Sequence, residues 1–355
     1  MLNRPFIELL RQDTQGLIDE MAQDAIREEE QKLNSEDDIL QKYLHSACDM
    51  LLSPTATMNC LMEPLLPRVG VAALVGSSDS GKSSLLRGLA MAVASGAGKY
   101  LGFELKPLHA RALYVSTEDD RDSLSTLMRR QVAELGRIAD DYERLEFIFD
   151  TTNLIEVLDL SLTRRPADLV IVDAFADLYT GPMNENNRVR SFINLFSQLA
   201  QKHSTLVIFL HHTGKRTEVL MPSKHNAIGS QGFEAKMRLM MELRPDPVRH
   251  EIRHLCVVKG NYLSSEFKHD SFELRFTEGL NFEATGNRVP FGALREYDPE
   301  RERRDAERTA EKEAERASRI SEIRALQEQG LSMREIAEAL GYKNKSSISR
   351  LLAEE

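Results

Sequence analysis

The chain has 355 residues, of which 41% are apolar and 29% are charged, and its net charge is −10. These values are typical of a soluble protein with enough chain for two or three domains, and they exclude a disordered or fibrous class. The negative charge argues against a bulk electrostatic grip on nucleic acid. A local basic site stays possible, because the field depends on how charge is distributed.

The cysteines and the N-terminus indicate an intracellular protein. Cys48, Cys60 and Cys256 show no metal-ligand spacing, and their odd number argues against a disulfide framework. The first residues show no signal-peptide pattern, and no stretch approaches the ~20 apolar residues of a membrane span. We therefore expect a cytoplasmic location and no membrane partner.

Residues 1–62 are predicted to form an N-terminal helical segment. Apolar residues in IELLRQDTQGLIDEMAQDAIREEEQKL recur at helical spacing, and acidic residues dominate the polar face. Such a segment would pack on the core or on a neighbouring subunit, and it carries no evident chemistry.

Residues 63–296 are predicted to be an α/β core. Short apolar runs that alternate with amphipathic helices favour a mostly parallel sheet with helices on both faces. After Arg238, four more apolar runs follow without helices between them, so we expect an antiparallel extension of the sheet. The runs of the parallel part are VAALV (71–75), ALYVS (112–116), LEFIF (145–149), DLVIV (168–172) and TLVIFL (205–210).

The stretch VGSSDSGKSSLLRG fits the phosphate-loop pattern G-x-x-x-x-G-K-[ST] and lies between a strand and a helix, as that motif requires. Its glycines let backbone N–H groups curl around phosphates, Lys82 would reach the β- and γ-phosphates, and the Ser83 hydroxyl would bind Mg²⁺. The motif therefore predicts binding of ATP and Mg²⁺ by Gly76, Ser77, Ser78, Asp79, Ser80, Gly81, Lys82, Ser83 and Ser84.

Polar residues at other strand ends are expected to complete this site, because ligands of open parallel sheets bind outside the carboxyl ends of the strands. Asp173 would hold the magnesium shell, and Glu118 would polarise the attacking water. His212, in the sequence HHTGK, would sense the γ-phosphate. A metal site at the histidine pair is an alternative, although no Cys or carboxylate accompanies it at ligand spacing.

Read together, GSSDSGKSS, YVSTEDD, VIVDAFADL, FLHHTGK and VVKGNY resemble the RecA-like ATPase core, and in particular the RepA-type hexameric helicases of plasmids and other mobile elements. The resemblance implies a homo-oligomeric, hexameric ring with ATP between neighbouring subunits. It implies that Arg238 and Lys259 complete the neighbour's site in trans. Related rings often have Lys-x-Arg where this chain has Lys259 and Asn261, so the second charge would come from Arg238.

The resemblance also places the polar loop between Lys215 and Gly229 at the central channel of such a ring. Lys215, Arg216 and Lys224 would then contact phosphates of single-stranded DNA. The alternative is a solvated loop without a ligand.

The C-terminal part divides into a charged helical linker, residues 297–317, and a three-helix module, residues 318–355. The sequence GLSMREIAEALGYKNKSSISRLL resembles a helix-turn-helix of the resolvase or sigma-factor type. That resemblance implies binding of duplex DNA, with a trihelical protein-interaction module as the alternative. The contact residues would be Lys345, Ser346, Ser347, Ser349 and Arg350.

Two functions fit these features. The first is an ATP-driven ring motor on DNA, such as a replicative helicase. The second is an ATP-switched DNA-binding regulator or assembly factor that does not unwind DNA. A small-molecule kinase is disfavoured, because no lid for a phosphate acceptor is evident.

Overall fold

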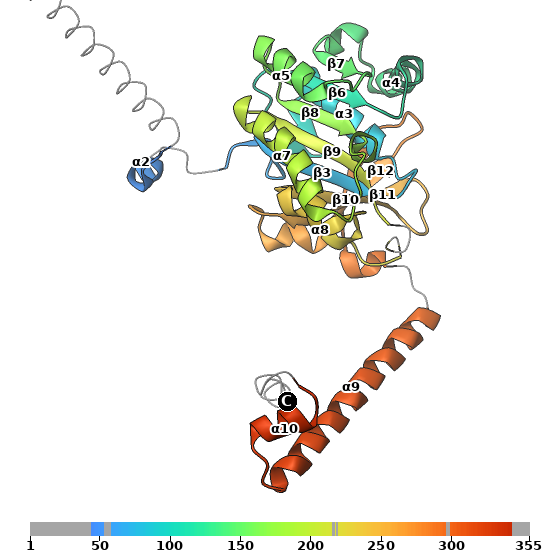
Figure 1. Cartoon of the computed structure of the whole chain (residues 1–355). Coiled ribbons are helices and arrows are strands. Elements are labelled where there is room, and N and C mark those ends of the chain that lie inside the picture. The colour runs from blue at the N-terminus through green and yellow to red at the C-terminus, as the bar shows by residue number, and fades with distance from the viewer. Residues whose placement is uncertain (1–43, 53–57, 215–216, 218, 296–298, 343–355) are drawn as a thin grey trace, which may run out of the picture. The chain divides into compact units, whose positions relative to one another are not determined.

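The computed structural model describes residues 44–52, 58–214, 217, 219–295 and 299–342 (Figure 1). The chain divides into two compact units, Met1–Asn59 and Cys60–Glu355. The described part of the first unit contains α2 (Ala47–Leu52), a short helix with no buried residue. Most of the expected N-terminal helical segment, residues 1–43, lies outside the described residues. The second unit starts with a strand at Cys60, so residues 60–62 belong to the core and not to the helical segment.

A nine-stranded sheet forms the centre of the second unit, in the order β13-β12-β11-β10-β3-β9-β8-β6-β7. The neighbouring strands from β10 to β7 run parallel, whereas β11, β12 and β13 extend the sheet in antiparallel fashion. This confirms the predicted mostly parallel sheet. The strands are β3 (Gly70–Gly76), β6 (Ala112–Ser116), β7 (Leu145–Ile148), β8 (Leu169–Asp173), β9 (Leu206–His212), β10 (Leu239–Pro245), β11 (Ile252–Gly260), β12 (Asp270–Phe276) and β13 (Phe282–Pro290).

The antiparallel extension begins one strand later than we expect from the sequence. The first of the four closing runs, RLMMEL, forms β10, which pairs in parallel with β3. The reason is the helix α8 (Ser230–Lys236), which returns the chain to the amino end of β3 before β10 starts. The phosphate-loop strand β3 therefore has parallel neighbours on both sides, β9 and β10.

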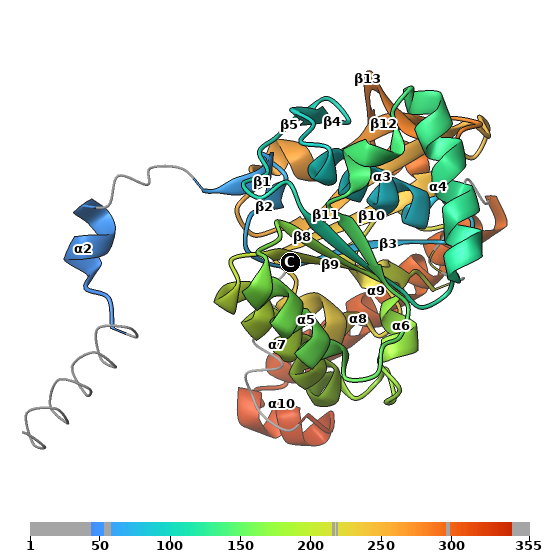
Figure 2. The same ribbon diagram turned by 90° about the horizontal axis from the view of Figure 1, so that it is seen from above.

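Helices cover both faces of the sheet, as Figure 2 shows. One face packs against α3 (Lys82–Ala94) and α4 (Arg121–Leu135), and the other packs against α5 (Leu154–Arg164), α7 (Asn186–Lys202) and α8. Strand β3 shows the alternation that this requires: Ala72 and Leu74 join the first core, whereas Val71, Ala73 and Val75 join the second. Shorter elements are α6 (Phe175–Leu178), η1 (Ala139–Tyr142), η3 (Lys224–Asn226), η4 (Ser265–Lys268) and η5 (Phe291–Leu294).

A second, small antiparallel sheet packs beside α3, in the order β2-β1-β5-β4. Leu61, Leu65 and Leu66 from this sheet are buried in the same core as α3. The sequence did not predict it, because strands this short give no measurable alternation. Its strands are β1 (Cys60–Glu63), β2 (Leu66–Pro67), β4 (Lys99–Tyr100) and β5 (Phe103–Leu105).

The C-terminal part contains α9 (Pro299–Glu328) and α10 (Met333–Ala339). The long helix α9 runs through the expected boundary between linker and module at residue 317, because no Gly or Pro interrupts the charged run. Ile323 packs with Ile336 and Ala337, and Ser332 forms the predicted capping box with Glu335. The third expected helix lies in residues 343–355, outside the described residues.

Candidate functional site

The carboxyl ends of β3, β6, β8 and β9 meet at one edge of the sheet and bring the predicted strand-end residues together. The register pairs Gly76 with His212 and Ser116 with Asp173. Glu118 follows β6 by two residues, and the phosphate loop follows β3. Parallel strands therefore carry four distant parts of the sequence to one site.

The phosphate loop, residues 77–81, is shaped by close contacts and by internal hydrogen bonds. A Cβ on Gly76 would clash with the Leu243 carbonyl oxygen of β10, so only glycine fits there. Gly81 adopts φ +93°, in the left-handed region that glycine tolerates, and directly precedes α3. Ser80 Oγ donates to the Ser77 carbonyl at 2.9 Å, and Lys82 Nζ donates to the same carbonyl at 2.6 Å. The lysine therefore lies across the loop that would hold the phosphates.

Asp173 and Ser83 fit a magnesium ion. Asp173 is buried, and its Oδ2 accepts a hydrogen bond of 2.5 Å from the Tyr114 hydroxyl. Its Oδ1 is buried without a partner at hydrogen-bonding distance. Burial raises the pKa of Asp173, although Tyr114 and the nearby Ser83 hydroxyl lower it. A buried, unpartnered carboxylate oxygen beside a serine hydroxyl is the oxygen donor set that Mg²⁺ prefers.

Glu118 and His212 lie together at the same edge. His212 Nε2 is 3.7 Å from Glu118 Oε1, and both side chains are accessible to solvent. The preceding His211 is instead buried, and its Nε2 lies 3.0 Å from the Ile228 carbonyl. Burial lowers the pKa of His211 to about 4, so this imidazole is neutral. The geometry therefore gives the two histidines different roles: His212 faces the site and His211 belongs to the core.

Arg253 is a residue of this site that sequence reasoning missed. Its Nε donates to the Ser80 carbonyl of the phosphate loop at 3.1 Å. Its guanidinium lies 5.3 Å from the centre of the Phe276 ring, which stacks on Phe282 at 4.7 Å. Among the described residues, no carboxylate forms an ion pair with Arg253. The signal was the antiparallel order of β11, which returns its first residues to the edge where the phosphate loop lies.

Arg238 and Lys259 lie at the opposite end of the sheet from the phosphate loop. Arg238 precedes β10, and its side chain contacts Gly70, the first residue of β3. In the antiparallel pairing, Lys259 is opposite Met240, and the Asn261 N–H donates to the Arg238 carbonyl. The structure thus brings the two residues together, and it excludes a contact with the phosphate loop of the same chain.

The loop that we expected to be polar and mobile is held in place over its described part. Ser223 N–H donates to buried Glu242 at 3.0 Å, and Asn226 donates to the same carboxylate. Glu242 is paired with Arg244 at 2.7 Å, and Arg244 donates to the carbonyls of Leu220 and Thr217. Sequence reasoning could not find this clamp, because both of its charges lie inside an apolar strand. Lys215 and Arg216 lie outside the described residues.

Lys224, the third expected DNA contact, has an internal partner. Its Nζ is 2.8 Å from Glu234 Oε1 on α8. Lys259 Nζ donates to the Glu234 main-chain carbonyl at 2.6 Å and lies 3.8 Å from the same Oε1. The structure therefore connects two residues to which the sequence gives separate roles. The expected duplex contacts Lys345, Ser346, Ser347, Ser349 and Arg350 lie outside the described residues.

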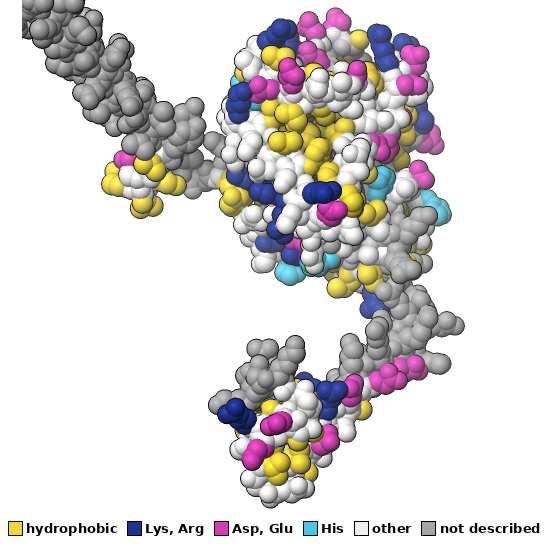
Figure 3. Space-filling model, viewed as in Figure 1, with side chains coloured by type: hydrophobic (Ala, Val, Ile, Leu, Met, Phe, Trp, Pro, Cys, Tyr) yellow, Lys and Arg dark blue, Asp and Glu magenta, His cyan; other side chains and the backbone are white. Residues whose placement is uncertain are grey.

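Apolar side chains gather on the face formed by α5 and α7, as the space-filling view shows (Figure 3). Val157 and Leu160 on α5 and Leu195 on α7 are exposed by 40%, 53% and 45%. A groove of about 500 Å³ lies between the two helices and is lined by Ile155 and Phe192, among others. An apolar surface of this kind is typical of a protein contact.

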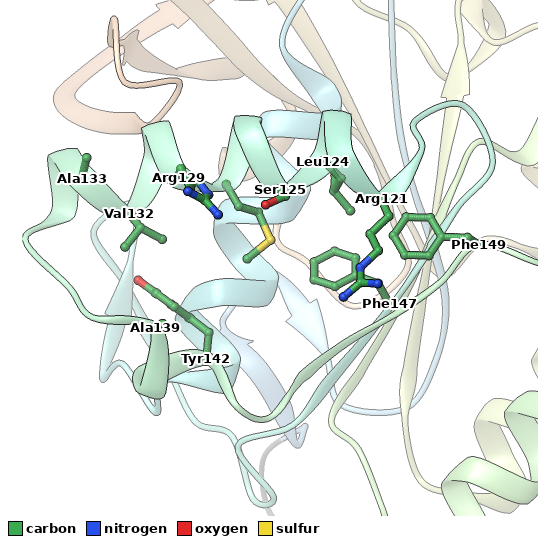
Figure 4. A pocket seen from close by; sticks show the side chains of 11 residues that line it. Arg121, Leu124, Ser125, Arg129, Val132, Ala133, Ala139, Tyr142, Phe147 and Phe149 are labelled. Carbon is green, nitrogen blue, oxygen red and sulfur yellow. The ribbon is translucent and has the colours of Figure 1, made fainter.

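A separate groove of about 600 Å³ lies between α4, η1 and β7 (Figure 4). Its lining is mainly apolar, and Arg121 lies beside Phe147 and Phe149. Neither Arg121 nor Arg129 forms an ion pair with a described residue. No residue of the phosphate loop lines this groove, so it is not part of the nucleotide site.

In the part of the chain that the structure describes, no helix combines the length and the apolar character needed to span a bilayer. No cluster of three potential metal ligands from His, Cys, Asp and Glu occurs in that part of the chain.

Comparisons with known proteins agree with this architecture. Residues 38–218, just over half of the chain, match the AAA domain family (AAA_25). Among solved structures, the ATPase domain of a helicase is similar, with a TM-score of 0.50 and 12% sequence identity. The match covers 69% of this chain and 98% of the solved helicase domain, and at this identity it concerns the fold. A search of curated proteins found no match.

Proposed function

This chain belongs to the AAA domain family and has the RecA-like fold of a P-loop ATPase; from this premise we propose that it is a ring-forming, ATP-hydrolysing motor on DNA, related to the RepA-type helicases. One observation carries the proposal. The phosphate loop lies at one end of the sheet, and Arg238 and Lys259 lie together at the other end. This arrangement suits a site that two neighbouring subunits share.

Within one subunit, the residues described above divide the work of hydrolysis. The loop N–H groups and Lys82 bind the phosphates, while Ser83 and Asp173 hold Mg²⁺, which supplies charge neutralisation at the phosphates when it is bound. Glu118 orients the attacking water, and His212, 3.7 Å from it, contacts the γ-phosphate. Arg253 and Phe276 hold the nucleotide base by stacking beside the loop.

Arg238 of the next subunit completes the site as an arginine finger, and Lys259 adds a second positive charge. A finger of this kind contributes ~10³–10⁵ in rate, so an isolated subunit hydrolyses ATP slowly. The exposed apolar face of α5 and α7 supports self-association, and a hexamer is the state that the family resemblance implies.

DNA enters the proposal through two segments. The loop with Lys215, Arg216 and Lys224 binds a single strand in the channel, and the C-terminal module binds duplex DNA. The packed pair α9–α10 with its capping box supports a helix-turn-helix. A role on a mobile element follows from the resemblance to RepA-type proteins, and a cytoplasmic location remains an expectation from the sequence.

The alternative is an ATP-switched DNA-binding regulator that does not unwind DNA, and the attached C-terminal module favours it. The deciding experiment measures ATP hydrolysis with and without single-stranded and duplex DNA, together with strand displacement. We expect stimulation by single-stranded DNA and ATP-dependent displacement. Stimulated hydrolysis without displacement would select the regulator, and hydrolysis that no DNA affects would reject both functions.

A further inference from the structure

Glu234 on α8 is the common partner of three cationic side chains. Its Oε1 is 2.8 Å from Lys224 Nζ and 3.8 Å from Lys259 Nζ, and its Oε2 is 3.8 Å from His225 Nδ1. The Glu234 side chain is only 13% exposed, whereas Lys224 and His225 are exposed by 40% and 64%. The carboxylate therefore lies beneath cations that solvent can reach from above.

The charges of this cluster do not balance. One carboxylate serves two lysines and a histidine, and no other described acidic side chain forms an ion pair with Lys224 or Lys259. Oxygen anions such as phosphates suit such a cluster, because ammonium groups donate to them through charge-assisted hydrogen bonds. Such a ligand has to displace Glu234 from Lys224, because the shorter of the two lysine contacts already occupies it.

We propose that Glu234 is an internal counter-ion of a phosphate-binding site formed by Lys224, His225 and Lys259, and that the phosphates of a single-stranded polynucleotide displace it. The identity of the ligand rests on the proposed function, whereas the competition between Glu234 and phosphate rests on the cluster alone. Lys259 keeps its bond to the Glu234 main-chain carbonyl throughout, so the side-chain carboxylate is the part that exchanges.

The shared carboxylate also makes Glu234 a positioning residue for the site between subunits. When a phosphate takes Lys224, Oε1 is left to Lys259 alone. Binding of the polynucleotide therefore changes the pairing of the residue that reaches the neighbour's nucleotide. Without the carboxylate, this connection is lost, and hydrolysis should respond less to the polynucleotide.

The test compares the wild type with Glu234→Gln, which keeps the shape and removes the charge. The matched control is Glu63→Gln, which removes the same charge from a surface ion pair with Lys106 at 2.7 Å. The probe is a fluorescent oligo-dT, titrated at several salt concentrations. We expect Glu234→Gln to bind about five- to tenfold more tightly at low salt. The slope of log K against log salt should steepen by about 0.7 for each lysine released. Glu63→Gln should behave as the wild type.

A second probe, long-chain inorganic polyphosphate, separates this inference from the proposed function. Tighter binding of polyphosphate but not of oligo-dT by Glu234→Gln supports the counter-ion and rejects DNA as the ligand. Equal binding by wild type and Glu234→Gln with both probes overturns the counter-ion. Adding Lys224→Gln to Glu234→Gln should return the affinity to the wild-type level.

A third readout does not depend on any ligand. Acylation of Lys224 by an amine reagent, quantified by mass spectrometry, should be severalfold faster in Glu234→Gln than in the wild type or in Glu63→Gln. Equal labelling of Lys224 in the three proteins would show that Glu234 does not hold it. In the ATPase assay, Glu234→Gln should show a smaller ratio of DNA-stimulated to basal hydrolysis.

Discussion

Asp173 illustrates how a single residue can be costly for stability and necessary for function. Its carboxylate is buried with one unpartnered oxygen, and burial raises its pKa, so the charged form destabilises the fold at neutral pH. We expect Asp173→Asn to unfold at higher urea concentration in the absence of nucleotide, with a gain of ~1 kcal/mol. The same variant should lose ATP hydrolysis and the stabilisation by ATP and Mg²⁺.

The control for this prediction is Asp177→Asn, whose carboxylate accepts a hydrogen bond from Thr117 and lies away from Ser83. It should retain hydrolysis. Asp173→Asn with wild-type hydrolysis would contradict the magnesium assignment.

His211 predicts a pH dependence of stability. Burial lowers its pKa from 6.5 to about 4, so on acidification protons bind the unfolded chain before they bind the folded one. The stabilisation is therefore present above pH 6.5 and is lost as the pH falls toward about 4, by ~3 kcal/mol in total. Urea unfolding at a series of pH values should show a shallower slope over this window for His211→Phe than for the wild type. The exposed substitution His109→Gln should leave the slope unchanged.

Arg253 should contribute to nucleotide affinity more than to the chemical step. Its guanidinium bonds the Ser80 carbonyl and covers the Phe276 ring, so its loss leaves the base without support. We expect Arg253→Ala to raise the Kd for ATP about tenfold, equivalent to ~1.4 kcal/mol, with a smaller effect on kcat. Equilibrium binding of a fluorescent ATP analogue measures this. Arg275→Ala, on the adjacent strand and exposed, is the control and should bind normally.

At the scale of elements, the sequence was most informative where a strand is long and buried. The runs 71–75, 112–116 and 205–210 correspond to β3, β6 and β9, because strands covered on both faces are continuously apolar. The strand-end residues followed from the same pattern. The small antiparallel sheet was missed because its strands are too short for periodicity.

Contacts between distant segments set the limit of prediction for the site. Asp173 and Glu118 were found because each follows a recognisable strand. Arg253 and the clamp of Glu242 and Arg244 were missed, because their positions depend on the order of strands in space. Sequence patterning reports the environment of a residue within its element and not the neighbour across the sheet.

The C-terminal elements predict an independent module. Ile323, Ile336 and Ala337 form a cluster separate from the two cores of the sheet. Deletion of residues 318–355 should therefore leave basal ATP hydrolysis within about twofold and abolish duplex binding, measured by fluorescence anisotropy. Ser332→Ala, which removes the cap of α10, should weaken duplex binding less, because a cap contributes only ~1 kcal/mol. Undiminished duplex affinity of the truncated chain would reject the assignment of this module.

At the scale of the whole molecule, the shared site predicts complementation between two inactive variants. Arg238→Ala should bind ATP and hydrolyse it poorly, whereas Lys82→Ala should lose activity through its own phosphate loop. In a mixture, a Lys82→Ala subunit can lend its intact Arg238 to a neighbour whose loop is intact. Hydrolysis by the mixture should exceed the sum of the separate variants, and no gain at any ratio would count against a site between subunits.

The separation of the phosphate loop from Arg238 and Lys259 gives each subunit a front and a back. Copies that bind front to back add in one direction only, and they close into a ring or continue into a filament. A copy that lacks both Lys82 and Arg238 would then silence its own site and the next one. Doping such copies into the wild type should reduce activity with the square of the intact fraction, so a minority of defective subunits would stall most of the assembly.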